Sequence, residues 1–143
     1  MNQSVKNFNL LYLAWILSLI SVAGSLFYSN YLMLPPCSLC WYQRICIFPL
    51  VLILGAGFLI KDKNVFWYAM PLTFIGWIIS LYHNLLYYKI IPKPLVACSA
   101  GASCTEKQIE YFGFISIPLM ALASLTLTLT ILLKFYNSQR MTK

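Results

Sequence analysis

The chain has 143 residues, of which 61% are hydrophobic and only 9% are charged. A soluble domain carries about 25% charged residues, so this composition excludes an ordinary soluble globular protein and indicates an integral membrane protein. The net charge of +7 does not indicate nucleic-acid binding here, because basic residues that flank membrane spans set the topology of a membrane protein.

Four long stretches of the sequence lack charged residues, and about 20 apolar residues are enough to cross a bilayer. In chain order these stretches predict spans at about residues 10–28, 42–60, 65–88 and 111–133. The longest segment between spans, 89–110, is too short to form its own core. We therefore expect an all-α membrane protein with a single domain, residues 1–143, built as a four-transmembrane-helix bundle. Pro71 and Pro118 would lie within spans.

The first cysteine pair, Cys37 and Cys40, lies just before the second predicted span. Pro35-Pro36 cannot sit inside a helix, so this helix should begin close to Cys37. Two intervening residues let the sulfurs meet, and the positive end of a helix stabilises the reactive thiolate. Arg44 follows Cys40 by four residues on the same helical face and adds positive charge. The pattern favours a redox-active dithiol, while a structural disulfide or half of a zinc site would have the same spacing.

His83 is the only histidine and lies near the end of the third span, at a membrane depth similar to that of Arg44. A histidine within a span is a functional candidate, and the alternative is a neutral ring that is hydrogen-bonded between helices. A quinone from the surrounding lipid has two carbonyl oxygens that need hydrogen-bond donors. Arg44 and His83 could be these donors beside Cys40.

The second cysteine pair, Cys98 and Cys104, flanks a stretch of small residues that precedes the fourth span. Two dithiols on one side of a membrane make thiol–disulfide exchange between them feasible. The alternatives are a static disulfide in the loop, or a metal site that uses both pairs. The fifth cysteine, Cys46, lies off the face of Cys40 and Arg44, so we expect it to pack as a small buried hydrophobe.

Basic residues are distributed unequally between the two ends of the predicted bundle. Four spans place both termini and the 61–64 loop on one side, with six basic residues: Lys6, Lys61, Lys63, Lys134, Arg140 and Lys143. The other side has four: Arg44, Lys89, Lys93 and Lys107. Because Lys and Arg are enriched on the cytoplasmic side, we expect a multi-pass cell-membrane protein with cytoplasmic termini and extracytoplasmic cysteine pairs, where disulfides persist.

The segment Cys37-Ser-Leu-Cys40-Trp-Tyr-Gln-Arg44 resembles the C-x-L-C-x-x-[EQ]-R motif of the DsbB family of disulfide-bond formation proteins. Tyr82-His83-Asn84-Leu85-Leu86 resembles the histidine segment of that family, and Cys104 to Pro118 resembles the segment that leads into its fourth helix. The resemblance covers essentially the whole chain and is greatest to the short BdbC-like members of Gram-positive bacteria. The chain departs from longer members in the short spacing of Cys98 and Cys104, and Gln43 replaces the glutamate of some members.

The resemblance implies a quinone-dependent thiol–disulfide oxidoreductase that reoxidises an extracytoplasmic thioredoxin-like partner of the DsbA or BdbD kind. It implies that Cys98 forms the mixed disulfide with the partner, and that Cys104 resolves it and exchanges with Cys37. Cys40 would pass electrons to a quinone, expected to be menaquinone, held near Arg44 with His83 assisting. The alternatives are a quinone reductase like vitamin K epoxide reductase, and a zinc- or heavy-metal-binding membrane protein that uses four cysteines and has no redox catalysis.

Overall fold

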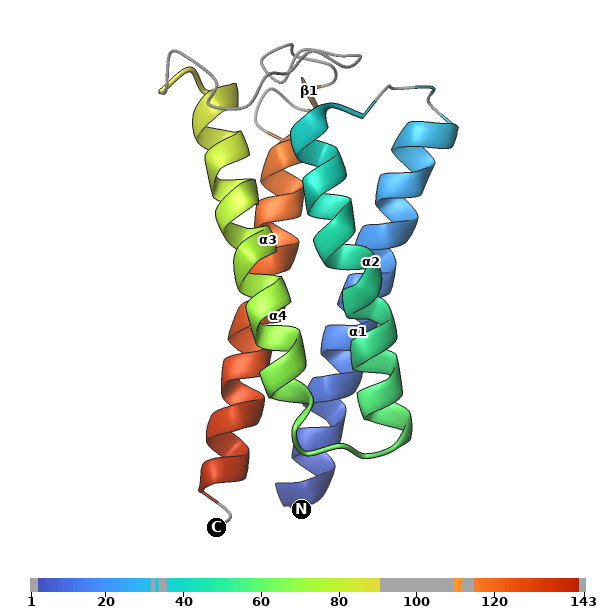
Figure 1. Ribbon diagram of the computed structural model, residues 1–143, viewed down its shortest axis with the longest axis vertical. Helices are drawn as coiled ribbons and strands as arrows, with labels where there is room; N and C mark the ends of the chain where they lie inside the picture. The colour runs from blue at the N-terminus through green and yellow to red at the C-terminus, as the bar shows by residue number, and fades with distance from the viewer. Residues whose placement is uncertain (1–2, 32, 34–35, 91–109, 112–114, 142–143) are drawn as a thin grey trace.

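The computed structural model describes residues 3–31, 33, 36–90, 110–111 and 115–141 (Figure 1). Its helices in chain order are α1 (Gln3–Asn30), α2 (Ser38–Leu59), α3 (Val65–Tyr87) and α4 (Ile117–Arg140). The shortest helix, α2, has 22 residues. At about 1.5 Å per residue it is long enough for the hydrocarbon core of a bilayer, which is roughly 30 Å thick. The predicted bundle of four helices, each long and apolar enough to span a membrane, is therefore confirmed.

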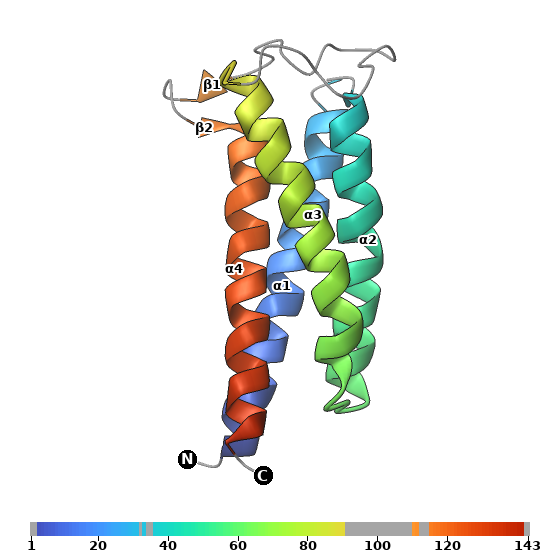
Figure 2. The same ribbon diagram turned by 60° about the vertical axis from the view of Figure 1, so that its left-hand side comes forward.

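The helices run alternately up and down, and each packs mainly against two neighbours. Both α1 and α3 pack against α2 and α4, so the four helices surround a common interior (Figures 1 and 2). Both termini and the turn between α2 and α3 lie at one end, whereas α2 begins at the opposite end. The turn is short because Lys61 adopts a positive φ of 56° and Asp62 Oδ1 accepts a hydrogen bond from the backbone N of Asn64 at 2.8 Å.

The start of the fourth helix differs from the prediction. The sequence predicts a span from residue 111, but α4 begins at Ile117 and continues to Arg140. Glu110–Tyr111 (β1) and Ile115–Ser116 (β2) instead pair as a short antiparallel ladder (Figure 2). Pro118 therefore lies within the fourth span, as predicted, but in the first turn of α4. A proline is well tolerated there, because an N–H in the first turn has no partner within the helix.

The largest apolar core fills the half of the bundle that is nearer the termini. Its buried side chains come from all four helices: Leu11, Ala14, Leu50, Leu54, Val65, Phe66, Ala69, Leu132 and Phe135. Small residues let the helices approach closely, as is usual in membrane bundles. At Gly57 of α2, for example, a Cβ atom would collide with the side chain of Val65 at the start of α3.

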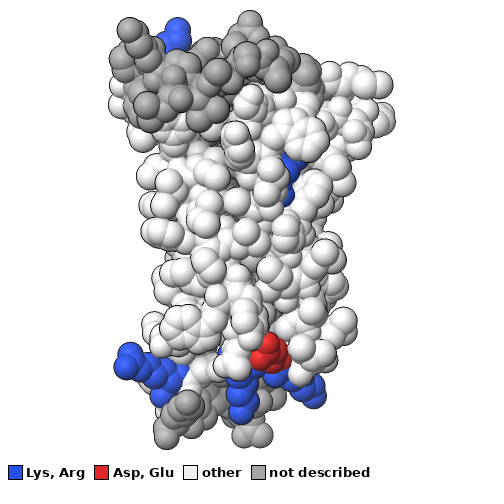
Figure 3. Space-filling view, in the orientation of Figure 1, with Lys and Arg blue, Asp and Glu red and all other residues white. Residues whose placement is uncertain are grey.

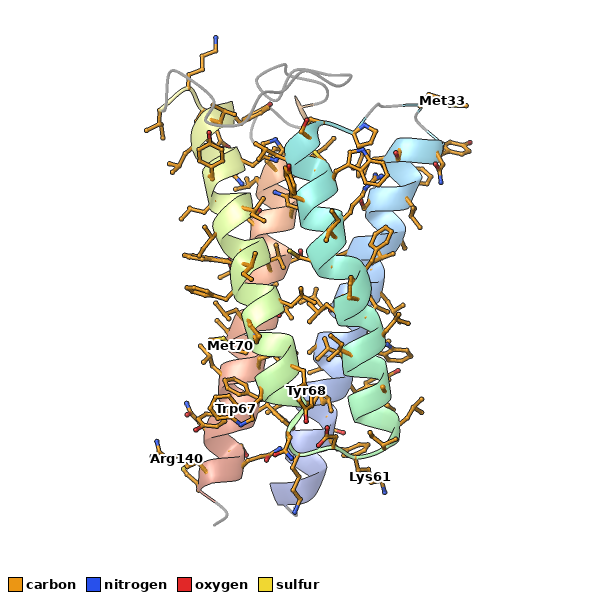
Figure 4. The ribbon with its side chains drawn as sticks, in the orientation of Figure 1. Met33, Lys61, Trp67, Tyr68, Met70 and Arg140 are labelled. Atoms are coloured by element: carbon orange, nitrogen blue, oxygen red, sulfur yellow. The ribbon has the colours of Figure 1, made fainter. Side chains whose placement is uncertain are left out.

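Charge and buried polarity are separated along the bundle. Lys and Arg gather at the end that holds the termini, and a broad, mostly uncharged band lies beyond them (Figure 3). Figure 4 shows Lys61 and Arg140 at this end and Met33 at the opposite end. The half of the bundle toward Met33 contains a group of buried polar side chains from α2 and α3: Gln43, Ser80, His83 and Asn84. Buried polar groups in a span indicate a functional site.

Candidate redox site

The first cysteine pair lies at the N-terminus of α2. Cys37 is the N-cap of the helix and has an extended backbone, with φ −70° and ψ 167°. Its Sγ accepts a hydrogen bond from the backbone N of Cys40 at 3.4 Å, so the expected helix start close to Cys37 is confirmed. The two Sγ atoms are 2.9 Å apart. A disulfide bond, which is about 2.05 Å long, can therefore form with only a small movement of the side chains.

The two cysteines have different surroundings. Cys37 is only 4% exposed, and its Sγ lies 3.8 Å from Nε2 of His83 on α3. Leu39 and Leu86 are buried in the same small cluster. Cys40 is partly exposed and lines a cavity whose wall also includes residues of α1 and α4. Of the two cysteines, Cys37 is therefore the one in contact with the histidine ring, and Cys40 is the one that lines the cavity.

The pKa of the Cys37 thiol is lowered well below its ordinary value. The largest cause is the Cys40 thiol, which donates a hydrogen bond to the sulfur of Cys37. Burial acts in the opposite direction, because it disfavours a charged sulfur, but the contact with His83 adds to the lowering. Cys37 is therefore the thiolate when the pair is reduced, which makes it the more reactive sulfur at neutral pH.

Arg44 lies one turn after Cys40 on α2 and is held by α1. Its Nε donates a hydrogen bond to Ser25 Oγ, and its Nη2 donates to the backbone O of Ser25, both at 2.8 Å. The guanidinium carbon also lies 5.5 Å from the centre of the Trp41 ring, which is a cation–π distance. These contacts fix the positive charge in the wall of the cavity that Cys40 lines. Ser25 was not identified from the sequence, because only the tertiary structure brings its helix to Arg44.

The cavity between α1, α2 and α4 has a volume of about 330 Å³. Its apolar wall includes Leu17, Ile20, Tyr28, Ile47, Phe48 and Met120. Cys40, Gln43 and Arg44 supply polar groups from α2. An apolar cavity with a few fixed polar groups is typical of a site for a small, mainly apolar ligand. Of the two residues expected to bind a quinone, Arg44 lines this cavity and His83 is absent from the described residues that line it.

His83 is held by the side chain of Gln43, which the sequence singled out only as a departure from the family pattern. Gln43 Nε2 lies 3.4 Å from His83 Nδ1, and the Gln43 side chain is buried. The next residue, Asn84, donates from Nδ2 to the backbone O of Ser80 and the backbone O of Pro118, both at 2.8 Å. Asn84 therefore ties the end of α3 to the start of α4 next to the dithiol. The sequence signal that could have identified Gln43 and Asn84 is the presence of an amide side chain within an apolar span.

Of the other three cysteines, the structure describes only Cys46. Cys98 and Cys104, the predicted second pair, lie outside the described residues. Cys46 is 5% exposed and packs where α3 crosses α2, since a Cβ atom at Gly76 would lie 3.1 Å from the Cβ of Cys46. This environment agrees with the packing role expected for Cys46.

A metal ion is the alternative ligand for the dithiol. The donor atoms of Cys37, Cys40 and His83 lie within 4.8 Å of one another, which is close enough for one ion. Structural zinc sites use four protein ligands, so this group of three would need another ligand to complete such a site. The two cysteines that the sequence offered for a four-cysteine site lie outside the described part of the chain.

Comparison with known proteins identifies the family. A model described as "Disulfide bond formation protein DsbB" matches residues 7–135. A "Probable disulfide formation protein C 2" of Bacillus cereus is 44% identical over 131 residues, which is 92% of each chain. A "Probable disulfide formation protein" of Coxiella burnetii is 39% identical over 137 residues, 93% of this chain and 91% of that protein. One of Oceanobacillus iheyensis is 45% identical over 117 residues, 79% of each chain. No solved structure matches the chain. With a DsbB match over most of its length, the chain belongs to the DsbB family of disulfide bond formation proteins.

Proposed function

We propose that this protein is a quinone-dependent thiol–disulfide oxidoreductase that reoxidises an extracytoplasmic thioredoxin-like protein. The observation that carries the proposal is the position of Cys40, which pairs with Cys37 and also lines an apolar cavity beside Arg44. A dithiol in this position can exchange with other thiols and can give electrons to a lipid-soluble oxidant. Membership of the DsbB family supports a role in disulfide-bond formation.

The side chains around the cavity fit a quinone head group. The ring of a quinone is apolar, which matches the apolar side chains of the cavity wall. Its carbonyl oxygens need hydrogen-bond donors, and the guanidinium of Arg44 is such a donor. When bound, a quinone accepts two electrons and two protons from the dithiol and becomes a quinol. Arg44 would bind and orient the head group, and the apolar walls would keep water from the reacting sulfur. We propose menaquinone as the species, because the chain resembles the Gram-positive members.

The thiol exchange would follow the order that the family resemblance implies. Cys98 receives the partner's thiolate and forms a mixed disulfide, and Cys104 leaves as a thiolate. The thiolate of Cys104 attacks Cys37, which breaks the Cys37–Cys40 disulfide and releases Cys40. Each step forms one S–S bond and breaks one, so the electron pair passes from the partner to Cys40 without an additional reductant.

The proposed site lies on the extracytoplasmic side of the cell membrane. Among the described residues, Lys61, Lys63, Lys134 and Arg140 are on the side of the termini, and Arg44 and Lys89 are toward the dithiol. This distribution supports cytoplasmic termini by the positive-inside rule. An extracytoplasmic dithiol would also meet an oxidising environment and an exported partner.

The proposed function is tested by mixing the pre-reduced protein with a menaquinone analogue without oxygen and measuring quinol formation. We expect Cys37→Ala and Cys40→Ala to abolish quinol formation, and Arg44→Ala to weaken the apparent affinity for the quinone. Cys98→Ala and Cys104→Ala should retain quinone reduction by the Cys37–Cys40 dithiol but should not oxidise a reduced thioredoxin-like protein. If both loop variants still oxidise that protein, the proposed relay is wrong.

The cluster of Cys37, Cys40 and His83 also supports metal binding as a second candidate function. Metal analysis of the purified, reduced protein distinguishes the two. One equivalent of zinc that persists through purification, together with no quinone reduction, would favour the metal-binding protein.

A further inference from the structure

Both ring nitrogens of His83 have buried partners on the opposing helix. Nδ1 faces the amide nitrogen of Gln43 at 3.4 Å, and Nε2 faces Sγ of Cys37 at 3.8 Å. His83, Gln43 and Cys37 are 3%, 6% and 4% exposed, so water does not compete freely for these contacts. A hydrogen bond in such surroundings is stronger than one at a surface.

The partner at Nδ1 decides which ring nitrogen carries the proton. An amide nitrogen can only donate, so Nδ1 must accept from Gln43 with its lone pair. The proton of a neutral imidazole is then on Nε2, where it points toward the sulfur of Cys37.

We propose that His83 is a catalytic residue for Cys37 and that Gln43 is the positioning residue that sets the His83 tautomer. In this arrangement Nε2–H donates a hydrogen bond to the thiolate of Cys37. The inference rests on the proposed function and deepens it: His83 acts on the thiol-exchange side of the dithiol, and Arg44 acts on the cavity side.

The hydrogen bond matters in the step in which Cys37 leaves. After the exchange described above, Cys37 is bound to Cys104. A second thiolate of the partner attacks the partner's sulfur in the mixed disulfide, which releases the oxidised partner and leaves Cys98 as a thiolate. The thiolate of Cys98 then attacks the sulfur of Cys104, so that the Cys98–Cys104 bond forms and the Cys104–Cys37 bond breaks. The electron pair of the broken bond stays on Cys37 as a thiolate, which accepts the hydrogen bond from His83. A more stable thiolate is a better leaving group, and it makes the Cys37–Cys40 disulfide a stronger oxidant.

Few other titratable groups surround His83 in the described part of the chain. Cys37 and Cys40 lie close to it at the start of α2, Tyr82 precedes it on α3, and the buried Tyr87 follows it by one turn on the same helix. The charge of Arg44 is engaged by Ser25 of α1. The first two turns of α4, residues 117–124, contain no titratable side chain. A titration of Cys37 should therefore report mainly on His83 once Cys40 is removed.

The test is a pH titration of Cys37 in full-length protein with Cys40, Cys46, Cys98 and Cys104 replaced by alanine. Ultraviolet absorbance measures the thiolate directly and does not require a reagent to reach the buried sulfur. In this background we expect His83→Phe and Gln43→Leu each to raise the titration midpoint. A shift of one pH unit would lower the thiolate fraction about tenfold at a pH below both midpoints. His83→Gln, whose side chain retains an N–H donor, should restore part of the shift.

The matched control is Thr73→Val, which removes a buried hydroxyl from the same helix ten residues before His83. We expect it to leave the midpoint unchanged. An unchanged midpoint in both His83→Phe and Gln43→Leu overturns the inference, and a shift in His83→Phe alone overturns the role of Gln43. The titration uses neither quinone nor partner protein. The inference about His83 and Gln43 can therefore be overturned while the proposed function holds, and the proposed function can be overturned while this inference holds.

Discussion

The guanidinium of Arg44 on α2 is fixed by a single residue of α1. Ser25 accepts two hydrogen bonds from it, one at Oγ and one at the backbone carbonyl oxygen, and both are 2.8 Å long. The two contacts leave Arg44 little freedom to turn away from the cavity. A positively charged side chain that is already held in place loses less conformational entropy when a ligand binds to it.

Replacing Ser25 with alanine should weaken quinone binding less than replacing Arg44 does. Ser25→Ala removes the bond to Oγ and keeps the bond to the backbone oxygen, so we expect a loss of about 1 kcal/mol, or roughly fivefold in apparent quinone affinity. The measurement is the KM for the quinone in steady-state assays. Ser18→Ala is the matched control, because Ser18 is a buried serine of α1 whose hydroxyl donates to the backbone O of Ala14 and not to Arg44. Equal KM values for the Ser25 and Ser18 variants would show that Ser25 does not position Arg44.

Filling the cavity should block quinone reduction without damaging the bundle. Gly24 of α1 lines the cavity, and a Cβ atom built there meets no other atom within 4 Å. Gly24→Leu should therefore occupy ligand space, and it should not reduce stability, because glycine inside a helix costs roughly 0.5–1 kcal/mol relative to alanine. We expect quinol formation to fall strongly while thiol exchange by the Cys37–Cys40 pair continues. Gly24→Ala is the graded control, with a smaller loss. Full quinone reduction by a stable Gly24→Leu protein would place the quinone elsewhere.

Removing the tie between α3 and α4 should lower stability. Asn84 donates two hydrogen bonds at 2.8 Å, of which the one to Pro118 joins the two helices. Hydrogen bonds between membrane helices contribute about 1 kcal/mol, so Asn84→Ala should lower the free energy of unfolding by about that amount. Thermal unfolding in detergent measures the effect. Asn137→Ala, at an exposed position of α4, is the control. The same melting temperature for both variants would contradict the structural role of Asn84.

The orientation in the membrane can be tested with two matched methionines. Met33 and Met141 are 81% and 80% exposed. Met141 directly follows Arg140, the last residue of α4, at the end of the bundle opposite Met33 (Figure 4). In a cysteine-free background, Met33→Cys should react with a membrane-impermeant thiol reagent in intact cells, whereas Met141→Cys should react only after permeabilisation. The substitutions change no charge, so they should not disturb the topology. The reverse labelling pattern would place the dithiol in the cytoplasm and would exclude the proposed function.

The number of helices and the start of α2 could be predicted from the sequence alone, because both follow from local properties. A long uncharged stretch must form a helix in lipid, since its backbone has no water to bond with. Two prolines directly before Cys37 cannot lie inside a helix, so the sequence places the start of α2 close to Cys37, whatever the neighbouring helices do. Hydropathy did not predict that Glu110–Tyr111 pairs with Ile115–Ser116. A short apolar segment can form either a strand or the start of a helix, and hydropathy does not distinguish the two.

The partners of the candidate site residues depended on tertiary structure. The sequence places Cys40 and Arg44 on one face of one helix, and both do line the same cavity. It assigned His83 to the same ligand from its membrane depth, but depth does not specify the direction in which a side chain points. Packing of α3 against α2 directs His83 to Cys37 and Gln43, and packing of α1 brings Ser25 to Arg44. Contacts between helices depend on rotation about each helix axis, which only the assembled bundle determines.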